Sequence, residues 1–255
     1  MKTRPDRDPC SYVHRDYRML AADGLLSSFV HFKETDLHIL ADRDVTDLAF
    51  DLALQGRLQI EAYIRRCPDF LTSLRPLPGD DLAPAVVKGM LAAATIADVG
   101  PMAAVAGAIA EVVGRGLIKA GCAEVIVENG GDIYLQRSED CTVAIFAGPS
   151  PLSLKVGVRL AAERMPVAVC TSSGTVGHSL SFGEADAVAV VASSTALADA
   201  VATRLGNEVG KKAGGGINIA RALEVGRGIS GVQGVVVICG DKIGAVGDIE
   251  LVKLR

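Results

Sequence analysis

Tryptophan is absent from this sequence of 255 residues, and aromatic residues make up only 4% of it. So few aromatic side chains argue against a surface on which nucleic-acid bases stack. The formal net charge is -4, so there is also no overall basic field to attract a phosphate backbone. The sequence therefore predicts no nucleic-acid partner.

Long apolar runs are missing as well. The most apolar stretches, residues 90–96 and 102–110, are separated by Asp98 and Pro101. Each is shorter than the roughly 20 residues that a membrane-spanning helix needs. The first twenty residues alternate basic and acidic side chains without an apolar signal segment, which predicts a cytoplasmic protein with no membrane partner. The six cysteines form no CxxC pair, which favours reduced, mostly buried thiols over a disulfide or metal role.

Hydrophobic periodicity predicts the order of the secondary-structure elements. Before residue 121 it indicates two strands and then three helices, at 25–32, 35–40, 44–67, 84–99 and 102–120. After residue 121 it indicates short, Val-rich strands interrupted by two helices. These strands are expected at 124–128, 133–136, 142–146, 155–160, 167–171, 187–192, 232–239 and 242–246, and the helices at 196–209 and 217–225.

The mixture of helices and strands lacks regular alternation. It therefore favours an α+β fold with a mixed sheet and packed helices over a doubly wound parallel sheet. We expect residues 1–24 to form a charged N-terminal arm and residues 25–255 to form one domain, which could divide into two lobes near residue 121.

Three polar segments interrupt the apolar pattern. In the first, the strand expected at 124–128 leads into Asn129, Gly130, Gly131 and Asp132. Paired glycines let backbone N–H groups face a ligand without obstruction by a Cβ, and the flanking acidic side chains can bind ribose hydroxyls or a metal. A simple hairpin turn is the alternative interpretation and explains these residues nearly as well.

The second polar segment is a run of hydroxyl-bearing residues and glycine that follows a strand expected to be buried. Such a run supplies donors for a phosphate group, although a flexible polar turn explains it equally well. A single histidine stands near its end. The residues in question are Thr171, Ser172, Ser173, Gly174, Thr175 and His178.

The third polar segment is the helix expected at 196–209. Asp199 and Thr203 are four residues apart and so lie on one face of it. A carboxylate and a hydroxyl one turn apart can give a hard divalent cation two oxygen ligands, with substrate phosphates and water as the others. Most such pairs are instead solvated or hydrogen-bonded locally. Small side chains in the helix expected at 102–120 leave room either for a flat ligand or for close helix packing.

In sequence order, these segments resemble the ApbE family, flavin transferases that use FAD to place FMN on a Thr or Ser of a target protein. The chain is most similar to a cytosolic ApbE-like branch that carries the motifs GPMAAVAGAIAE, ENGGDI and TSSGTVGHS, found here at residues 100–111, 128–133 and 171–179. The resemblance implies an ApbE-like α+β fold, FAD or a related nucleotide as ligand, Mg²⁺, and a protein acceptor.

The resemblance also implies roles for single residues. The family's GxxxD helix motif falls on Gly107 and Glu111, so Glu111 becomes a candidate flavin contact with Glu in place of Asp. The Asp-x-x-x-Thr motif, whose side chains hold Mg²⁺, falls on Asp199 and Thr203, and Asp199 is also expected to be catalytic. His178 is expected to contact the substrate or to assist proton transfer. The other expected cofactor-binding residues are Asn129, Gly130, Gly131, Asp132, Thr171, Ser172, Ser173, Gly174 and Thr175.

The sequence departs from the family at further points. Ala106 stands where the family has a Lys before the GxxxD motif, and residues 181–184 replace its DPxTG segment. These departures favour an alternative function, that of a cytosolic ligand-binding or cofactor-biosynthesis protein that kept the fold without transferring FMN. For either function, helices rich in small residues predict a homodimer, the commonest oligomer.

Overall fold

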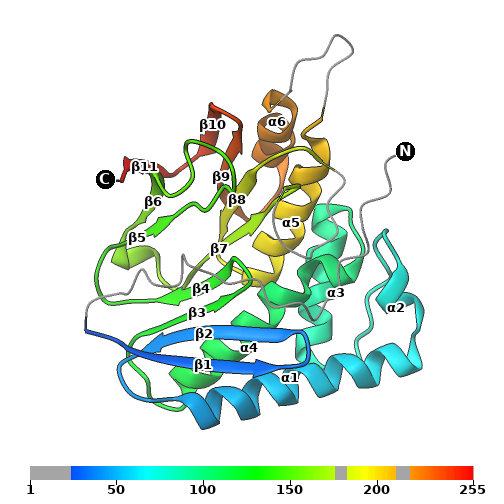
Figure 1. The fold of residues 1–255 in the computed structure, drawn as a ribbon. Coiled ribbons are helices and arrows are strands. Elements are labelled where there is room, and N and C mark those ends of the chain that lie inside the picture. The colour runs from blue at the N-terminus through cyan, green and yellow to red at the C-terminus, as the bar shows by residue number, and fades with distance from the viewer. Residues whose placement is uncertain (1–23, 176–182, 211–218, 255) are drawn as a thin grey trace.

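The structure, a computed structural model, describes residues 24–175, 183–210 and 219–254. Its strands form two sheets (Figure 1). The larger sheet has eight strands, in the order β1 (Leu26–Phe32), β2 (Thr35–Ala41), β3 (Val125–Asn129), β4 (Asp132–Gln136), β7 (Val167–Ser172), β8 (Ala187–Ala192), β9 (Val232–Cys239) and β10 (Lys242–Gly247). The smaller sheet has three, in the order β11 (Glu250–Lys253), β6 (Val156–Leu160) and β5 (Cys141–Ala144).

Helices cover one face of the larger sheet and the smaller sheet packs on the other (Figure 1). In β8, Val188 and Val190 belong to the core under the helices, whereas Ala189 and Val191 belong to the core under the smaller sheet. Both faces of β8 are thus buried, which explains its apolar sequence without polar alternation. The helical elements are α1 (Thr46–Arg66), α2 (Asp69–Thr72), α3 (Ala85–Ala97), η2 (Pro101–Ala104), α4 (Val105–Lys119), η3 (Ala162–Arg164), α5 (Thr195–Glu208) and α6 (Ala220–Gly228).

The α+β class predicted from the sequence is confirmed, and most predicted elements lie within a few residues of the observed ones. The sheet differs from the predicted mixed one, because the strand pairs in the described residues are all antiparallel. Hairpins account for several of these pairs. Between β8 and β9, two helices carry the chain away and back, so β9 returns antiparallel to β8.

Residue 121, near which a division into two lobes is predicted, lies between α4 and β3. The sheet continues across this point, since β2 pairs with β3 from Leu37 opposite Asn129 to Ala41 opposite Val125. The predicted arm, residues 1–24, lies outside the described residues except for its last residue.

The helical stretch Pro101–Lys119 is long and apolar enough to cross a membrane by length and composition, and half of its most apolar window is buried inside the fold. Ile109, Val113 and Leu117 form the buried stripe of α4, at the spacing of a core helix. A Cβ added at Gly114 would lie 2.1 Å from a ring atom of Tyr134 in β4. This glycine therefore serves close packing of α4 on the sheet.

Candidate functional site

The N-terminal turns of α4 and α5 meet at the centre of the predicted site. Oδ2 of Asp199 in α5 accepts a hydrogen bond from the backbone N–H of Gly107 in α4, at 2.8 Å. The residue before α4, Ala104, has no side chain that could cap the helix. Asp199 therefore supplies the acceptor that the first turn of α4 lacks, and its negative charge suits the positive end of the helix dipole.

Glu111 makes the corresponding contact in the opposite direction. Its Oε2 accepts from the N–H groups of Thr195 (2.8 Å) and Ala196 (3.3 Å) and from Oγ of Ser194 (3.0 Å), all at the start of α5. Its Oε1 pairs with Arg115, one turn further along α4, at 2.8 Å. In this structure the carboxylate that is expected to contact flavin thus lies in the contact between two helices.

Gly107 allows this close contact. A Cβ built on Gly107 would lie 2.4 Å from the backbone oxygen of Thr195 and 2.8 Å from Cβ of Asp199. Both distances are shorter than non-bonded atoms tolerate. The small residues in this helix were interpreted either as room for a flat ligand or as a surface for close helix packing, and Gly107 fits close helix packing.

Strands β3 and β4 form a hairpin with a two-residue turn. Asn129 pairs with Asp132, so Gly130 and Gly131 are the two turn residues. Gly130 and Gly131 have φ angles of 70° and 103°, which glycine adopts without the strain that a Cβ causes. The amide of Asn129 donates to the carbonyl oxygen of Ala106 at 3.0 Å and so joins this turn to the first turn of α4. The hairpin interpretation is confirmed, and a ligand role for the turn stays a prediction.

Asp132 is a buried carboxylate at the start of β4. Burial raises its pKa well above the ordinary range, and the negative charges of Asp199 and Glu128 raise it further. Burial also raises the pKa of Asp199, to about 7, against the opposing effect of the N–H groups of Gly107 and Ala106. The sheet and α5 therefore bring two carboxylates together where their charges repel each other.

Two uncharged groups beside these carboxylates were not identified from the sequence as site residues. Cys170 stands opposite Asp132 in the β4–β7 ladder, and its thiol lies 3.4 Å from the carbonyl oxygen of Thr195. Burial, followed by the charges of Asp132 and Asp199, raises the pKa of the Cys170 thiol well above its usual value. The hydroxyl of Thr195 is fully buried and has no hydrogen-bond partner within the described part of the chain. Thr195 precedes Asp199 by four residues, a spacing that could have indicated their shared helix face.

Thr203 is half-buried one turn beyond Asp199 on α5. In the residues that the structure describes, no group of three or more His, Cys, Asp or Glu side chains could hold a metal ion. A cation at this corner would therefore need ligands of other kinds as well, such as hydroxyl oxygens, substrate phosphates or water.

The end of β7 lies beside the β3–β4 turn, since the N–H of Thr171 donates to the carbonyl oxygen of Gly131 at 3.2 Å. Further on, the hydroxyl of Thr175 donates to Asp186 at 3.1 Å, and the same carboxylate accepts from the N–H of Gly240 at 2.7 Å. Asp186, which the sequence did not indicate, thus anchors this segment to the β9–β10 turn.

The remaining residues of this segment differ in their surroundings. Ser172 is buried at the end of β7, and Oγ of Ser173 accepts from the N–H of Thr175 at 3.1 Å. Gly174 donates to the carbonyl oxygen of Ala185 at 2.8 Å. His178 lies outside the described residues.

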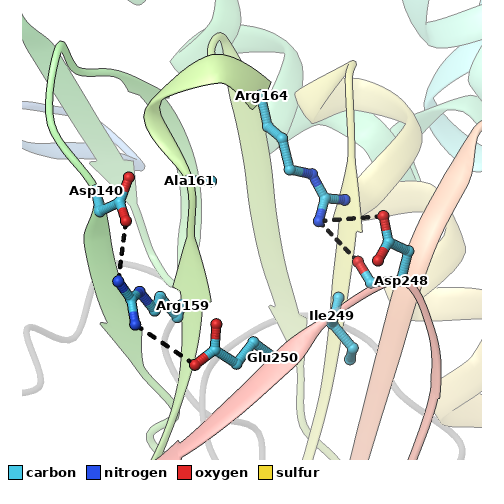
Figure 2. Close-up of a pocket in the computed structure, with 7 residues that line it drawn as sticks. All are labelled: Asp140, Arg159, Ala161, Arg164, Asp248, Ile249 and Glu250. Atoms are coloured by element: carbon cyan, nitrogen blue, oxygen red, sulfur yellow. Dashed lines mark hydrogen bonds and ion pairs between the residues drawn. The ribbon is translucent and has the colours of Figure 1, made fainter.

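Two surface hollows lie away from these residues. One, of about 360 Å³, is lined by arginines that already pair with acidic side chains (Figure 2). Figure 2 shows Arg159 between Asp140 and Glu250, and Arg164 directed at Asp248. The other, of about 580 Å³, surrounds the start of α1 at residues 43–48. Neither hollow contains a predicted site residue.

Comparison with known proteins finds both sequence relatives and structural neighbours. Residues 18–250 match the model of a family described as AbpE bacteria. A UPF0280 protein of Methanocaldococcus jannaschii is 45% identical over 226 residues, which cover 87% of this chain and 91% of that protein. A UPF0280 protein of Methanococcus aeolicus is 41% identical over 228 residues, which cover 88% and 91%.

Two solved structures share the fold. The ApbE protein of Thermotoga maritima aligns with a TM-score of 0.54 and 10% identity, covering 86% of this chain and 96% of that one. The apo form of the flavinyl transferase ApbE of Pseudomonas stutzeri aligns with a TM-score of 0.52 and 13% identity, covering 89% and 95%. The ApbE-like fold predicted from the sequence is confirmed, and identities this low carry no conclusion beyond the fold.

Proposed function

The chain belongs to the family described as AbpE bacteria, and from this premise we propose that it binds FAD or a related nucleotide with Mg²⁺ and transfers FMN to a Thr or Ser of a protein. One observation carries the proposal. Asp132 and Asp199 come from different elements, lie in a largely buried corner, and raise each other's energy when both are charged. A protein gains nothing for its stability from such a pair, whereas a bound cation would neutralise both charges.

The residues at this corner suit Mg²⁺ better than a metal that needs a complete cage of side chains. Mg²⁺ is commonly held by one or two carboxylates, with substrate phosphates and water as further ligands. Asp199 and Thr203 would hold the ion, and Asp132 would face it from the sheet. One Asp199 oxygen already accepts from the N–H of Gly107, so a cation would share this carboxylate with the first turn of α4.

The nucleotide would lie against two turns beside this corner. The first is the β3–β4 turn at Gly130 and Gly131, and the second is the segment of residues 171–175. Gly130 and Gly131 have no Cβ to obstruct a phosphate, and the bond between Thr171 and Gly131 joins the second turn to the first. We assign phosphate contacts to these two turns, including Asn129, Ser172, Ser173, Gly174 and Thr175. The N–H of Gly131 donates to Glu128 at 2.7 Å, and the first turns of α4 and α5 donate to Asp199 and Glu111, so a phosphate at any of these N–H groups would replace an existing hydrogen bond.

In the transfer, the hydroxyl oxygen of the acceptor Thr or Ser attacks the phosphorus of the FMN half of FAD. The bond between that phosphorus and the bridging oxygen breaks, and AMP leaves with the electron pair. The hydroxyl proton passes to a base, for which His178 and Asp199 are the candidates. Mg²⁺, when bound, supplies positive charge against the pyrophosphate and the departing AMP.

The test is a measurement of AMP released when the purified protein is mixed with FAD, Mg²⁺ and a Thr- or Ser-containing acceptor. The wild type should release AMP and attach flavin to the acceptor, and Asp199→Ala should do neither. Asp140→Asn, at the distant hollow of Figure 2, is the control and should retain the activity. Full AMP release by Asp199→Ala would refute the assignment.

A binding experiment distinguishes FMN transfer from the alternative function, that of a ligand-binding protein that kept the fold. A ligand that binds only the folded protein raises its stability by RT ln(1 + [L]/Kd), which amounts to about 2.7 kcal/mol at a hundred times Kd. Stabilisation by FAD and Mg²⁺ without any AMP release would favour a binding protein that kept the fold. The departure at Ala106, where the family has a Lys, is the observation that favours this alternative.

We also propose that the protein acts in the cytoplasm as a homodimer. Sedimentation velocity should then give twice the mass of one chain, and a single-chain mass would contradict the dimer.

A further inference from the structure

Helices α4 and α5 hold each other's first turns through two carboxylates, one from each helix. Asp199 of α5 accepts from the N–H of Gly107, and Glu111 of α4 accepts from the N–H of Thr195, each at 2.8 Å. In both helices the carboxylate stands four residues after the N–H group that the partner helix binds. The exchange is reciprocal, because a shift of α5 that breaks one bond also displaces the residue that makes the other.

Glu111 makes the larger number of bonds in this contact. One of its oxygens serves three donors at the start of α5, and the other serves Arg115. The first N–H groups of a helix lack partners within the helix. At α5 Glu111 supplies partners for two of them, so this helix end needs no ligand to satisfy it.

We infer that Glu111 is a positioning residue, which fixes the first turn of α5 and thereby holds Asp199 toward Asp132, with Thr203 one turn further along the same helix. This differs from the flavin contact that the resemblance implies for Glu111. The inference rests on the proposed function, because it identifies what presents the two proposed cation ligands. It also makes a claim about the protein alone, namely that removing the Glu111 carboxylate frees the N–H of Gly107 from Asp199.

Amide hydrogen exchange followed by NMR tests that claim without any ligand. Glu111→Ala should speed exchange about tenfold or more at Thr195 and Ala196, as expected for the loss of a hydrogen bond to a charged group. It should also speed exchange at Gly107, although Asp199 is unchanged. Glu111→Gln keeps the side-chain length and one acceptor oxygen, so it should restore part of the protection at all three amides.

The matched control is Asp44→Ala. Asp44 accepts from the N–H of Thr46 at 3.0 Å in the first turn of α1, and it also accepts from the hydroxyls of Thr46 and Ser28, which are remote from α5 in sequence. Its loss should leave exchange at Thr195, Ala196 and Gly107 as in the wild type. If Glu111→Ala speeds exchange in α5 but leaves Gly107 unchanged, Glu111 only caps α5 and the inference is overturned.

Binding of Mn²⁺, followed by EPR, links the contact to the proposed cation site. Glu111→Ala should weaken Mn²⁺ binding about tenfold, which is the effect of one charge-assisted hydrogen bond. Glu111→Gln should weaken it less, and Asp44→Ala should leave it unchanged. Unchanged Mn²⁺ affinity in Glu111→Ala overturns the inference. If the wild type binds no Mn²⁺, the proposed cation function fails, and exchange at Gly107 still decides whether Glu111 positions Asp199.

Discussion

A single methyl group at Gly107 should separate α4 from α5. In Gly107→Ala the new Cβ would lie 2.4 Å from the backbone oxygen of Thr195, which cannot rotate away as a side chain can, and 2.8 Å from Cβ of Asp199. Overpacking of this kind costs roughly 1–3 kcal/mol. Alanine in place of glycine returns up to about 1 kcal/mol through helix propensity. We therefore expect a net loss of up to about 2 kcal/mol in the free energy of unfolding.

The measurement is urea denaturation of the wild type and two glycine variants. Gly89 is the matched control, because it lies on the exposed side of α3 and an added Cβ meets nothing within 4 Å. Gly89→Ala should stabilise the protein by about 0.5–1 kcal/mol, since it only restricts the unfolded chain. A Gly107→Ala protein as stable as Gly89→Ala would refute the close contact between the two helices.

Two further predictions follow from buried carboxylates. The pKa values of Asp132 and Asp199 are raised above those of the unfolded chain, so the stability linked to their protonation is complete below about pH 4 and is lost as the pH rises through the raised pKa of each group, which is about 7 for Asp199. Asp132→Asn should therefore gain stability over the wild type at pH 8 and lose that gain at pH 4, in urea titrations without divalent cations. An equal difference at both pH values would contradict the raised pKa. Asp186→Ala removes the acceptor of both Thr175 and Gly240 and should lower the free energy of unfolding by about 1–3 kcal/mol. Thermal denaturation measures this loss, and an unchanged melting temperature would show that the Asp186 contacts do not stabilise the fold.

Local patterns predicted those parts of the fold that depend on neighbouring residues. Hydrophobic periodicity indicates strands at 25–32 and 35–40, which the structure has as β1 and β2, and a helix at 196–209, which the structure has at Thr195–Glu208. The pairing of distant segments was harder to predict. The strand Glu250–Lys253 was not predicted at all, because its short sequence becomes a strand only by pairing with β6, about ninety residues earlier in the chain.

In the candidate site, too, local features could be predicted from the sequence, whereas contacts between distant segments could not. The spacing of Asp199 and Thr203 was enough to place both on one helix face, and the paired glycines were enough to indicate a turn. Spacing could not show that Asp199 binds Gly107, because the two residues are 92 positions apart and meet only when α4 packs on α5. The contact of Glu111 with the start of α5 depends on the same packing.

The most direct test of the proposed site is a crystal of the protein grown with FAD and Mn²⁺, with the metal located by anomalous diffraction. We predict a single strong Mn²⁺ peak within bonding distance of Asp199 and Thr203, with the FAD pyrophosphate against Gly130 and Gly131. A peak at another position, or FAD bound away from these two glycines, would contradict the assignment of this corner as the nucleotide and cation site.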